Sequence, residues 1–178
     1  MATSISHYSL PAPVFDTPTR VAIIVSPYYR EIADELLAGA KAALEAARVM
    51  YDIIEVPGAL EIPTAIRLAA NSGQYDGYVA LGCVIRGETT HYETVCNDSS
   101  RGLTLLGLEG LPIGNAILTV ENVEQAVVRA EAAGQNKGGG AAEAALHLIA
   151  IARRFTPEPA ARGEGEFRMA GHTSKSTA

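Results

Sequence analysis

A polar segment that ends in a histidine interrupts the apolar middle of the chain. Residues 77–85 are largely apolar, and they are followed directly by Arg86-Gly-Glu-Thr-Thr-His91. This pattern predicts a buried strand whose carboxyl end exits into a loop and then a helix, and ligands of open α/β sheets bind at that edge. Because histidine titrates near neutral pH, His91 is the candidate proton donor and acceptor.

The loop before His91 could bind an anion. Backbone N–H groups at the start of a helix carry a partial positive charge, Gly87 lets the backbone approach a ligand closely, and Thr89 and Thr90 add hydroxyl donors. The alternative is an ordinary strand-to-helix turn in which the threonines only cap the helix. The segment alone does not decide between a phosphate cradle and a cap.

The turn after the first predicted strand indicates an aromatic contact rather than a nucleotide site. Residues 26–30 read Ser-Pro-Tyr-Tyr-Arg and contain no glycine, whereas dinucleotide and triphosphate loops need glycines at this point. Tyr28 could stack on a flat heterocycle, although a surface tyrosine would look the same in the sequence.

Two further polar positions fall at or near the ligand edge. In the loop after the second predicted strand, Gly58 and Ala59 leave room for a ligand, and Glu61 could accept hydrogen bonds from hydroxyl groups or only complement the dipole of the next helix. Asn115 interrupts the fourth apolar segment, which indicates either an amide that contacts a ligand or a bulge in the strand.

These residues need a framework of alternating strands and helices. Strands are predicted at residues 21–25, 51–56, 77–85 and 113–119, and helices at residues 29–49, from about 61, at 91–108, from 122 and at 139–155. Asn122 and Gln125 have the spacing of a capping box. The alternation predicts an α/β protein, a three-layer αβα sandwich around a four-stranded parallel sheet.

Composition limits the class of protein. The chain has 178 residues, of which 48% are hydrophobic, so one domain with a substantial core is expected at residues 20–155. The net charge of −6, without a run of lysine or arginine, argues against nucleic acid or an anionic membrane as a partner. No apolar stretch of about 18 residues and no secretory signal is present, which favours a cytoplasmic protein. Cys83 and Cys96 lack metal-ligand spacing, so no metal site is expected.

The two ends of the chain differ from the core. Residues 1–19 contain several prolines and are expected to form an extended arm, which could pair with the sheet edge of a neighbouring subunit. Residues 156–178 are rich in glycine, proline, serine, threonine and charge, and they have too few apolar side chains to offset the entropy of ordering them. A disordered tail is therefore predicted.

Four sequence pieces in a fixed order resemble the lumazine synthase family. They are Val56-Pro-Gly-Ala-Leu-Glu-Ile-Pro63, Gly82-Cys-Val-Ile-Arg-Gly-Glu-Thr-Thr-His91, Gly114-Asn-Ala-Ile-Leu-Thr119 and Asn136-Lys-Gly138. Each piece alone is a weak signal, but the four together at compatible spacing are specific, and the resemblance spans roughly residues 20 to 155. It implies a flavodoxin-like fold and the condensation of 5-amino-6-(D-ribitylamino)uracil with 3,4-dihydroxy-2-butanone 4-phosphate to 6,7-dimethyl-8-ribityllumazine, the penultimate step of riboflavin biosynthesis.

The resemblance also implies a role for each matching residue and no redox cofactor or metal. Substrate contacts would come from Tyr28 by stacking, from Ala59, Leu60 and Glu61 to the ribityl chain and ring, from the backbone of Cys83, Val84 and Ile85 to the pyrimidinedione, and from Glu88 and Thr89 to phosphate. His91 would transfer protons. Asn115 and the phosphate-binding Arg129 would reach the site from a neighbouring subunit of a homopentamer, with Lys137 as a further basic residue nearby.

Some positions depart from the family pattern, and two rival functions stay open. Leu60 stands where many relatives have a larger aromatic residue, Tyr28 where phenylalanine or tryptophan is common, and Glu88 places a carboxylate in an anion loop. The rivals are an archaeal-type riboflavin synthase with the same fold and a non-catalytic shell protein that binds flavin or lumazine. A phosphate-binding loop beside His91 favours the synthase that uses a phosphorylated substrate. Pentamers, stacked pentamers and icosahedral capsids of sixty subunits all occur in the family.

Overall fold

The computed structural model describes residues 10–156 of the chain. The strands are β1 (Arg20–Val25), β2 (Met50–Glu55), β3 (Gly77–Ile85) and β4 (Ile113–Val120). The helices are α1 (Arg30–Ala46), α2 (Glu61–Asn71), α3 (His91–Leu108), α4 (Val123–Ala130) and α5 (Lys137–Phe155). No helix in this range is long and apolar enough to cross a membrane.

The strands form one parallel sheet in the order β2-β1-β3-β4, which confirms the predicted architecture. From β1 the chain winds outward to β2 on one side, and it then returns through α2 to place β3 on the other side of β1. The direction of winding therefore reverses between β1 and β3. Doubly wound sheets bind ligands outside the carboxyl ends of the strands at such a reversal.

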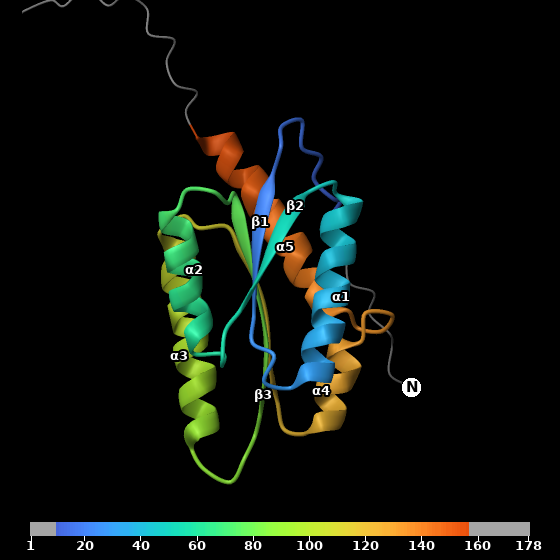
Figure 1. Cartoon of the computed structure of the whole chain (residues 1–178), viewed down its shortest axis with the longest axis vertical. Helices are drawn as coiled ribbons and strands as arrows, with labels where there is room; N and C mark the ends of the chain where they lie inside the picture. The colour runs from blue at the N-terminus through green and yellow to red at the C-terminus, as the bar shows by residue number, and fades with distance from the viewer. Residues whose placement is uncertain (1–9, 157–178) are drawn as a thin grey trace, which may run out of the picture.

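Helices cover both faces of the sheet (Figure 1). α2 and α3 lie on one face, and α1, α4 and α5 lie on the other. Ile23 of β1 packs with Leu36 of α1 in the larger core cluster, whereas the next residue, Ile24, packs with Ile62 of α2 in the other. Successive side chains of a strand point to opposite faces, so a strand covered on both sides is apolar throughout, as the sequence of β1 predicted.

The outer strand β4 alternates between buried and more exposed residues. It pairs with β3 without interruption from Ile113 to Val120, so Asn115 does not form a bulge. Instead, the side-chain oxygen of Asn115 accepts a 2.8 Å hydrogen bond from the backbone N–H of Ile117. This contact gives a hydrogen-bond acceptor to a backbone N–H of the outer strand. It leaves Asn115 exposed at the edge of the sheet, two residues from Ile113 and Ile117, which pack on the side of α2 and α3.

Asparagine caps start the last two helices. The side chain of Asn122 accepts a 2.9 Å hydrogen bond from the N–H of Gln125, as the capping-box spacing predicted. The return bond differs from the standard box, because Gln125 Oε1 accepts from the N–H of Glu121, one residue before the cap, at 3.0 Å. Asn136, in the left-handed region at φ 46°, caps α5 by accepting from the N–H of Gly139 at 3.0 Å.

The helix α5 begins at Lys137, two residues earlier than predicted, because the glycine run belongs to its first turn. A side chain on Gly138 would collide with the backbone of Leu36 in α1, and one on Gly114 would collide with the backbone of Ala141 in α5. Glycine therefore lets α5 approach both α1 and the sheet closely, which outweighs its low helix propensity.

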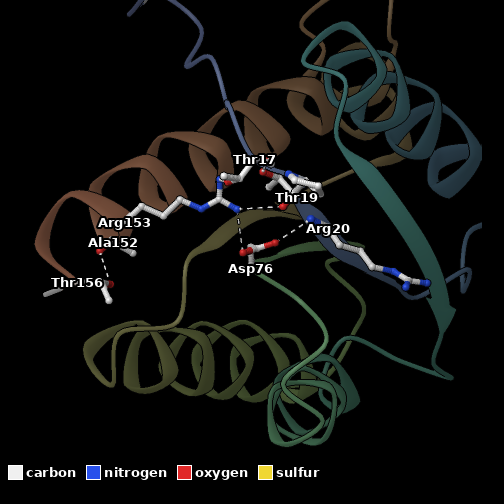
Figure 2. A network of polar contacts seen from close by, with 8 residues as sticks. Thr17, Thr19, Arg20, Asp76, Ala152, Arg153 and Thr156 are labelled. Atoms are coloured by element: carbon white, nitrogen blue, oxygen red, sulfur yellow. Dashed lines mark hydrogen bonds and ion pairs between the residues drawn. The ribbon is translucent and has the colours of Figure 1, made fainter. Parts of the chain in front are cut away.

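Polar contacts join the amino-terminal edge of the sheet to the residues before β1 (Figure 2). Arg153 points from α5 toward Thr17 and Asp76, donating hydrogen bonds of 3.0 Å to the hydroxyl of Thr17 and to Asp76 Oδ1. The other carboxylate oxygen of Asp76 accepts from the backbone N–H of Arg20 at 2.8 Å. The residues just before β1 are therefore held against the domain.

Residues 10–19 contain no helix or strand. The pairing of the amino-terminal arm with a neighbouring subunit stays a prediction. Residues 1–9 and the tail from residue 157, for which disorder was predicted, lie outside the described residues.

Candidate active site

A pocket of about 360 Å³ lies at the carboxyl edge of the sheet, where the winding reverses. Its walls come from the turn after β1, the loop into α2, the end of β3 and the start of α3. The volume is that of a site for a small organic molecule. Most of the predicted site residues line it, namely Tyr28, Ala59, Leu60, Glu61, Cys83, Val84, Ile85, Thr89 and His91.

His91 is the first residue of α3, and it is exposed at the pocket. The hydroxyl oxygen of Thr89 lies 3.4 Å from its backbone N–H and accepts a long hydrogen bond from it. The N-cap residue Thr90 makes no side-chain capping bond, so the capping alternative does not account for both threonines. Gly87 and Thr89 line the pocket together with His91, which leaves the loop beside the imidazole open to a ligand.

The loop into α2 supplies a carboxylate. Ala59 is buried, Leu60 is 37% exposed, and Glu61 is the first residue of α2. A Cβ atom on Gly58 would lie 2.8 Å from Glu61 Oε2, so the glycine makes room for this carboxylate over the loop. Glu61 can therefore accept hydrogen bonds from ligand hydroxyl groups while it also complements the dipole of α2.

Two tyrosines form the wall that follows β1. Tyr28 is 73% exposed, and its ring packs edge-on against Tyr29 with centroids 5.1 Å apart. Tyr29 lines the pocket as well, and burial raises the pKa of its phenol. A ring that is largely exposed and has one aromatic contact is available to stack on a planar ligand.

The end of β3 gives the pocket a largely apolar floor with backbone polar groups. Cys83 is 8% exposed, and Val84 and Ile85 are half-buried. Burial raises the pKa of the Cys83 thiol to about 11, so this side chain is neutral near pH 7 and acts as a small apolar group rather than a nucleophile.

The other predicted residues are not in this pocket. Asn115, Arg129 and Lys137 line a second hollow, of about 430 Å³, between β4 and the helices α4 and α5. The two hollows share no lining residue. Arg129 is half-buried and donates a 3.0 Å hydrogen bond to the backbone oxygen of Gln125, whereas Lys137 is exposed. Glu88 is exposed and lines neither hollow.

Four lining residues were missed by the sequence analysis, namely Ser26, Tyr29, Tyr92 and Val95. Helical spacing could have found Val95, because it lies four residues after His91 and so on the same face of α3. Tyr29 and Tyr92 are neighbours of predicted site residues, but adjacency alone does not show which way a side chain points.

The pocket has little positive charge of its own. Among the described residues that line it there is no lysine or arginine, and the nearby Arg86 is engaged by two carboxylates. Within residues 10–156, no three or more His, Cys, Asp or Glu side chains are grouped as a metal ion would require. A phosphorylated ligand would therefore depend on backbone donors, His91 and a cation from elsewhere.

Comparison with known proteins identifies the family of this chain. The model of the 6,7-dimethyl-8-ribityllumazine synthase family matches residues 18–153. The chain belongs to the lumazine synthase family. This confirms the resemblance found in the sequence.

Individual relatives agree with this assignment over most of their length. A 6,7-dimethyl-8-ribityllumazine synthase of Jannaschia sp. (strain CCS1) is 53% identical over 158 residues, which are 89% of this chain and 89% of the relative. The protein of the same name from Methylorubrum populi is 56% identical over 148 residues, covering 80% and 88%. The one from Bartonella tribocorum is 58% identical over 137 residues, covering 76% and 91%.

Proposed function

We propose that the chain condenses 5-amino-6-(D-ribitylamino)uracil with 3,4-dihydroxy-2-butanone 4-phosphate to 6,7-dimethyl-8-ribityllumazine, in the penultimate step of riboflavin biosynthesis. The observation that carries the proposal is the family match over residues 18–153, together with a pocket at the sheet reversal that places His91 beside an open loop. The matched relatives are named as lumazine synthases, which disfavours both a riboflavin synthase and a non-catalytic flavin-binding shell.

The reaction needs proton transfer at every step. The amine of the pyrimidine attacks the ketone, water leaves to give an imine, phosphate is eliminated, and the second nitrogen closes the ring with loss of a second water. His91 is the pocket residue suited to give and take these protons. The walls around it hold the two substrates together, which contributes the larger share of the acceleration.

The pocket residues divide between the two substrates. Tyr28 stacks on the pyrimidinedione ring, whose polar edge meets the backbone at Cys83, Val84 and Ile85. Glu61, beside Ala59 and Leu60, accepts hydrogen bonds from the ribityl hydroxyls. Glu88 and Thr89 bring backbone and hydroxyl donors to the phosphate, with the Glu88 side chain turned away from the pocket.

The missing cation comes from a second copy of the chain. Arg129 and Lys137 line the other hollow with Asn115, apart from the pocket of their own chain, and this supports a site that a neighbouring copy completes. A repeated head-to-tail contact of this kind generates a ring. We infer a homopentamer with active sites at the subunit interfaces; icosahedral capsids built from such pentamers would contain the same sites. We also infer a cytoplasmic protein without nucleic-acid or membrane partners.

Mixing the purified protein with both substrates and following lumazine absorbance tests the activity directly. Arg129→Ala should raise the KM for the phosphate substrate roughly ten- to a hundredfold, since a charge-assisted hydrogen bond contributes about 1.5–3 kcal/mol. The KM for the pyrimidine should change little. An unchanged saturation curve for the phosphate substrate would rule out the role of Arg129, and binding of flavin without turnover would favour a shell protein.

A further inference from the structure

Arg86 is the first residue after β3, in the loop that leads to His91, yet its side chain does not line the pocket. Its guanidinium instead forms an ion pair with Glu93 in the first turn of α3. On its other side, Arg86 Nε donates a 2.7 Å hydrogen bond to Glu121 Oε2, between β4 and α4. The arginine therefore bridges the first turn of α3 and the turn between β4 and α4, next to residues 87–90, the loop proposed to bind phosphate.

The bridge is fixed at more than its charged ends. The backbone N–H of Arg86 donates to the carbonyl oxygen of Val120 at 3.0 Å, which continues the β3–β4 pairing to the residue next to Glu121. Hydrogen bonding from Arg86 lowers the pKa of Glu93, so both partners are charged over the neutral pH range. The backbone N–H of Glu121 is in turn held by the side chain of Gln125 in α4.

Arg86 also reaches the pocket through an aromatic ring. Its guanidinium carbon lies 4.1 Å from the centroid of the Tyr92 ring, a distance at which a cation and a ring attract each other. Tyr92 follows His91 directly and lines the pocket. The guanidinium thus contacts a ring that lines the pocket, while its two carboxylate partners hold Arg86 at the start of the loop.

We propose that Arg86 is a positioning residue, which holds residues 87–91 and the ring of Tyr92 in the geometry that receives the phosphate-bearing substrate. The proposal rests on the proposed function for its substrate. Arg86 acts through Glu93, Glu121 and Tyr92 and does not itself bind phosphate. A planar guanidinium suits this role, because it presents donors in two directions and a flat face to the ring, which a lysine cannot do at once.

The side chains of the bridge are partly exposed, so their effect on the position of the loop can be measured apart from any effect on the stability of the domain. The side chain of Arg86 is 39% exposed, and those of Glu93 and Glu121 are 47% and 56% exposed. Exposed ion pairs contribute little to the free energy of unfolding, so loss of the bridge should loosen the loop without unfolding the domain.

Arg86→Gln tests the proposal, with Arg67→Gln as the matched control. Arg67 pairs with Glu109 between α2 and the end of α3, and its side chain is equally exposed at 39%. For Arg86→Gln we expect the KM of the phosphate substrate to rise on the order of tenfold or more, because a misplaced loop binds and aligns that substrate poorly. The KM of the pyrimidine and the unfolding midpoint should match those of the control.

A second measurement does not depend on turnover. Hydrogen exchange of the backbone amides in residues 87–93 should become faster in Arg86→Gln and stay at the wild-type rate in Arg67→Gln. Arg86→Lys should restore part of the lost affinity, since lysine can pair with one carboxylate at a time. Glu121→Gln, which leaves the arginine in place, should cause a smaller change in the same direction.

The two proposals can fail separately. If Arg86→Gln shows the exchange rates and the phosphate-substrate KM of Arg67→Gln, Arg86 has no positioning role, even though the wild-type protein forms lumazine. If the wild-type protein forms no lumazine but the exchange of residues 87–93 still depends on Arg86, the proposed function is wrong and the bridge stands.

Discussion

At the scale of single residues, the proposed chemistry depends on His91, the first residue of α3. His91 lines a pocket whose other side chains are mostly apolar or neutral, with Glu61 as the one carboxylate among the described lining residues. The nearby thiol of Cys83 stays protonated at neutral pH because burial raises its pKa to about 11. In the proposed mechanism, proton transfer is therefore assigned to the imidazole rather than to the thiol.

Replacing His91 with alanine should reduce kcat on the order of a hundredfold, the usual contribution of a positioned general acid and base. Some activity should remain, because alignment of the substrates does not need the imidazole. The measurement is steady-state lumazine formation with both substrates saturating. His147→Ala, in the middle of α5 and away from both hollows, is the control and should keep the wild-type rate. Equal rates for both variants would remove His91 from the mechanism.

At the scale of elements, α4 is a short helix whose position matters for Arg129. It has only 8 residues, and helices of this length are marginal without caps or packing. Its start depends on the hydrogen bond from the N–H of Gln125 to Asn122. The same turn holds the N–H of Glu121, a partner of Arg86. The cap therefore supports both the proposed bridge and the arginine proposed for the neighbouring site.

Loss of this cap should be measurable. Asn122→Ala should lower the free energy of unfolding by about 1 kcal/mol, because it leaves a helix N–H without its partner. Denaturant unfolding at a fixed protein concentration gives the difference. Asn71→Ala, at the exposed last residue of α2, should change stability by less than about 0.5 kcal/mol. Equal midpoints for Asn122→Ala and wild type would mean that packing alone holds α4.

At the scale of the whole molecule, the two hollows lie in different parts of one chain, and neither has a complete set of groups for a phosphorylated substrate. The first has His91 but no lysine or arginine among its described lining residues, and the second has Arg129 and Lys137 but no histidine. A site shared between copies would explain why both sets exist.

Mixing the two impaired variants tests this sharing, at a phosphate-substrate concentration near the wild-type KM, where both variants should be slow. We would unfold chains with His91→Ala and chains with Arg129→Ala and refold them together in equal amounts. Activity should return at roughly a quarter of the interfaces. At these interfaces one copy supplies the intact histidine and its neighbour supplies the intact arginine. Lumazine formation is compared with that of the two variants refolded apart and then combined. Activity no greater than this sum would indicate that His91 and Arg129 serve the same site from one chain.

Local sequence determined most of the elements and the residues at their ends. Unbroken apolar runs marked β1 and β3, because strands covered on both faces need no polar side, and α3 has the predicted bounds, His91–Leu108. The motifs at the ends of these elements also carried the family resemblance, and with it the site residues that no periodicity would have assigned.

Tertiary structure decided what depends on contacts between distant segments. The first turn of α5 includes the glycine run because Gly138 meets the backbone of α1, Asn115 covers an edge donor instead of forming a bulge, and Arg86 turns away from the ligand toward Glu93 and Glu121. Residue type and spacing show what a side chain is able to do. Only the folded chain brings together the partners, from separate elements, that determine which of these interactions it makes.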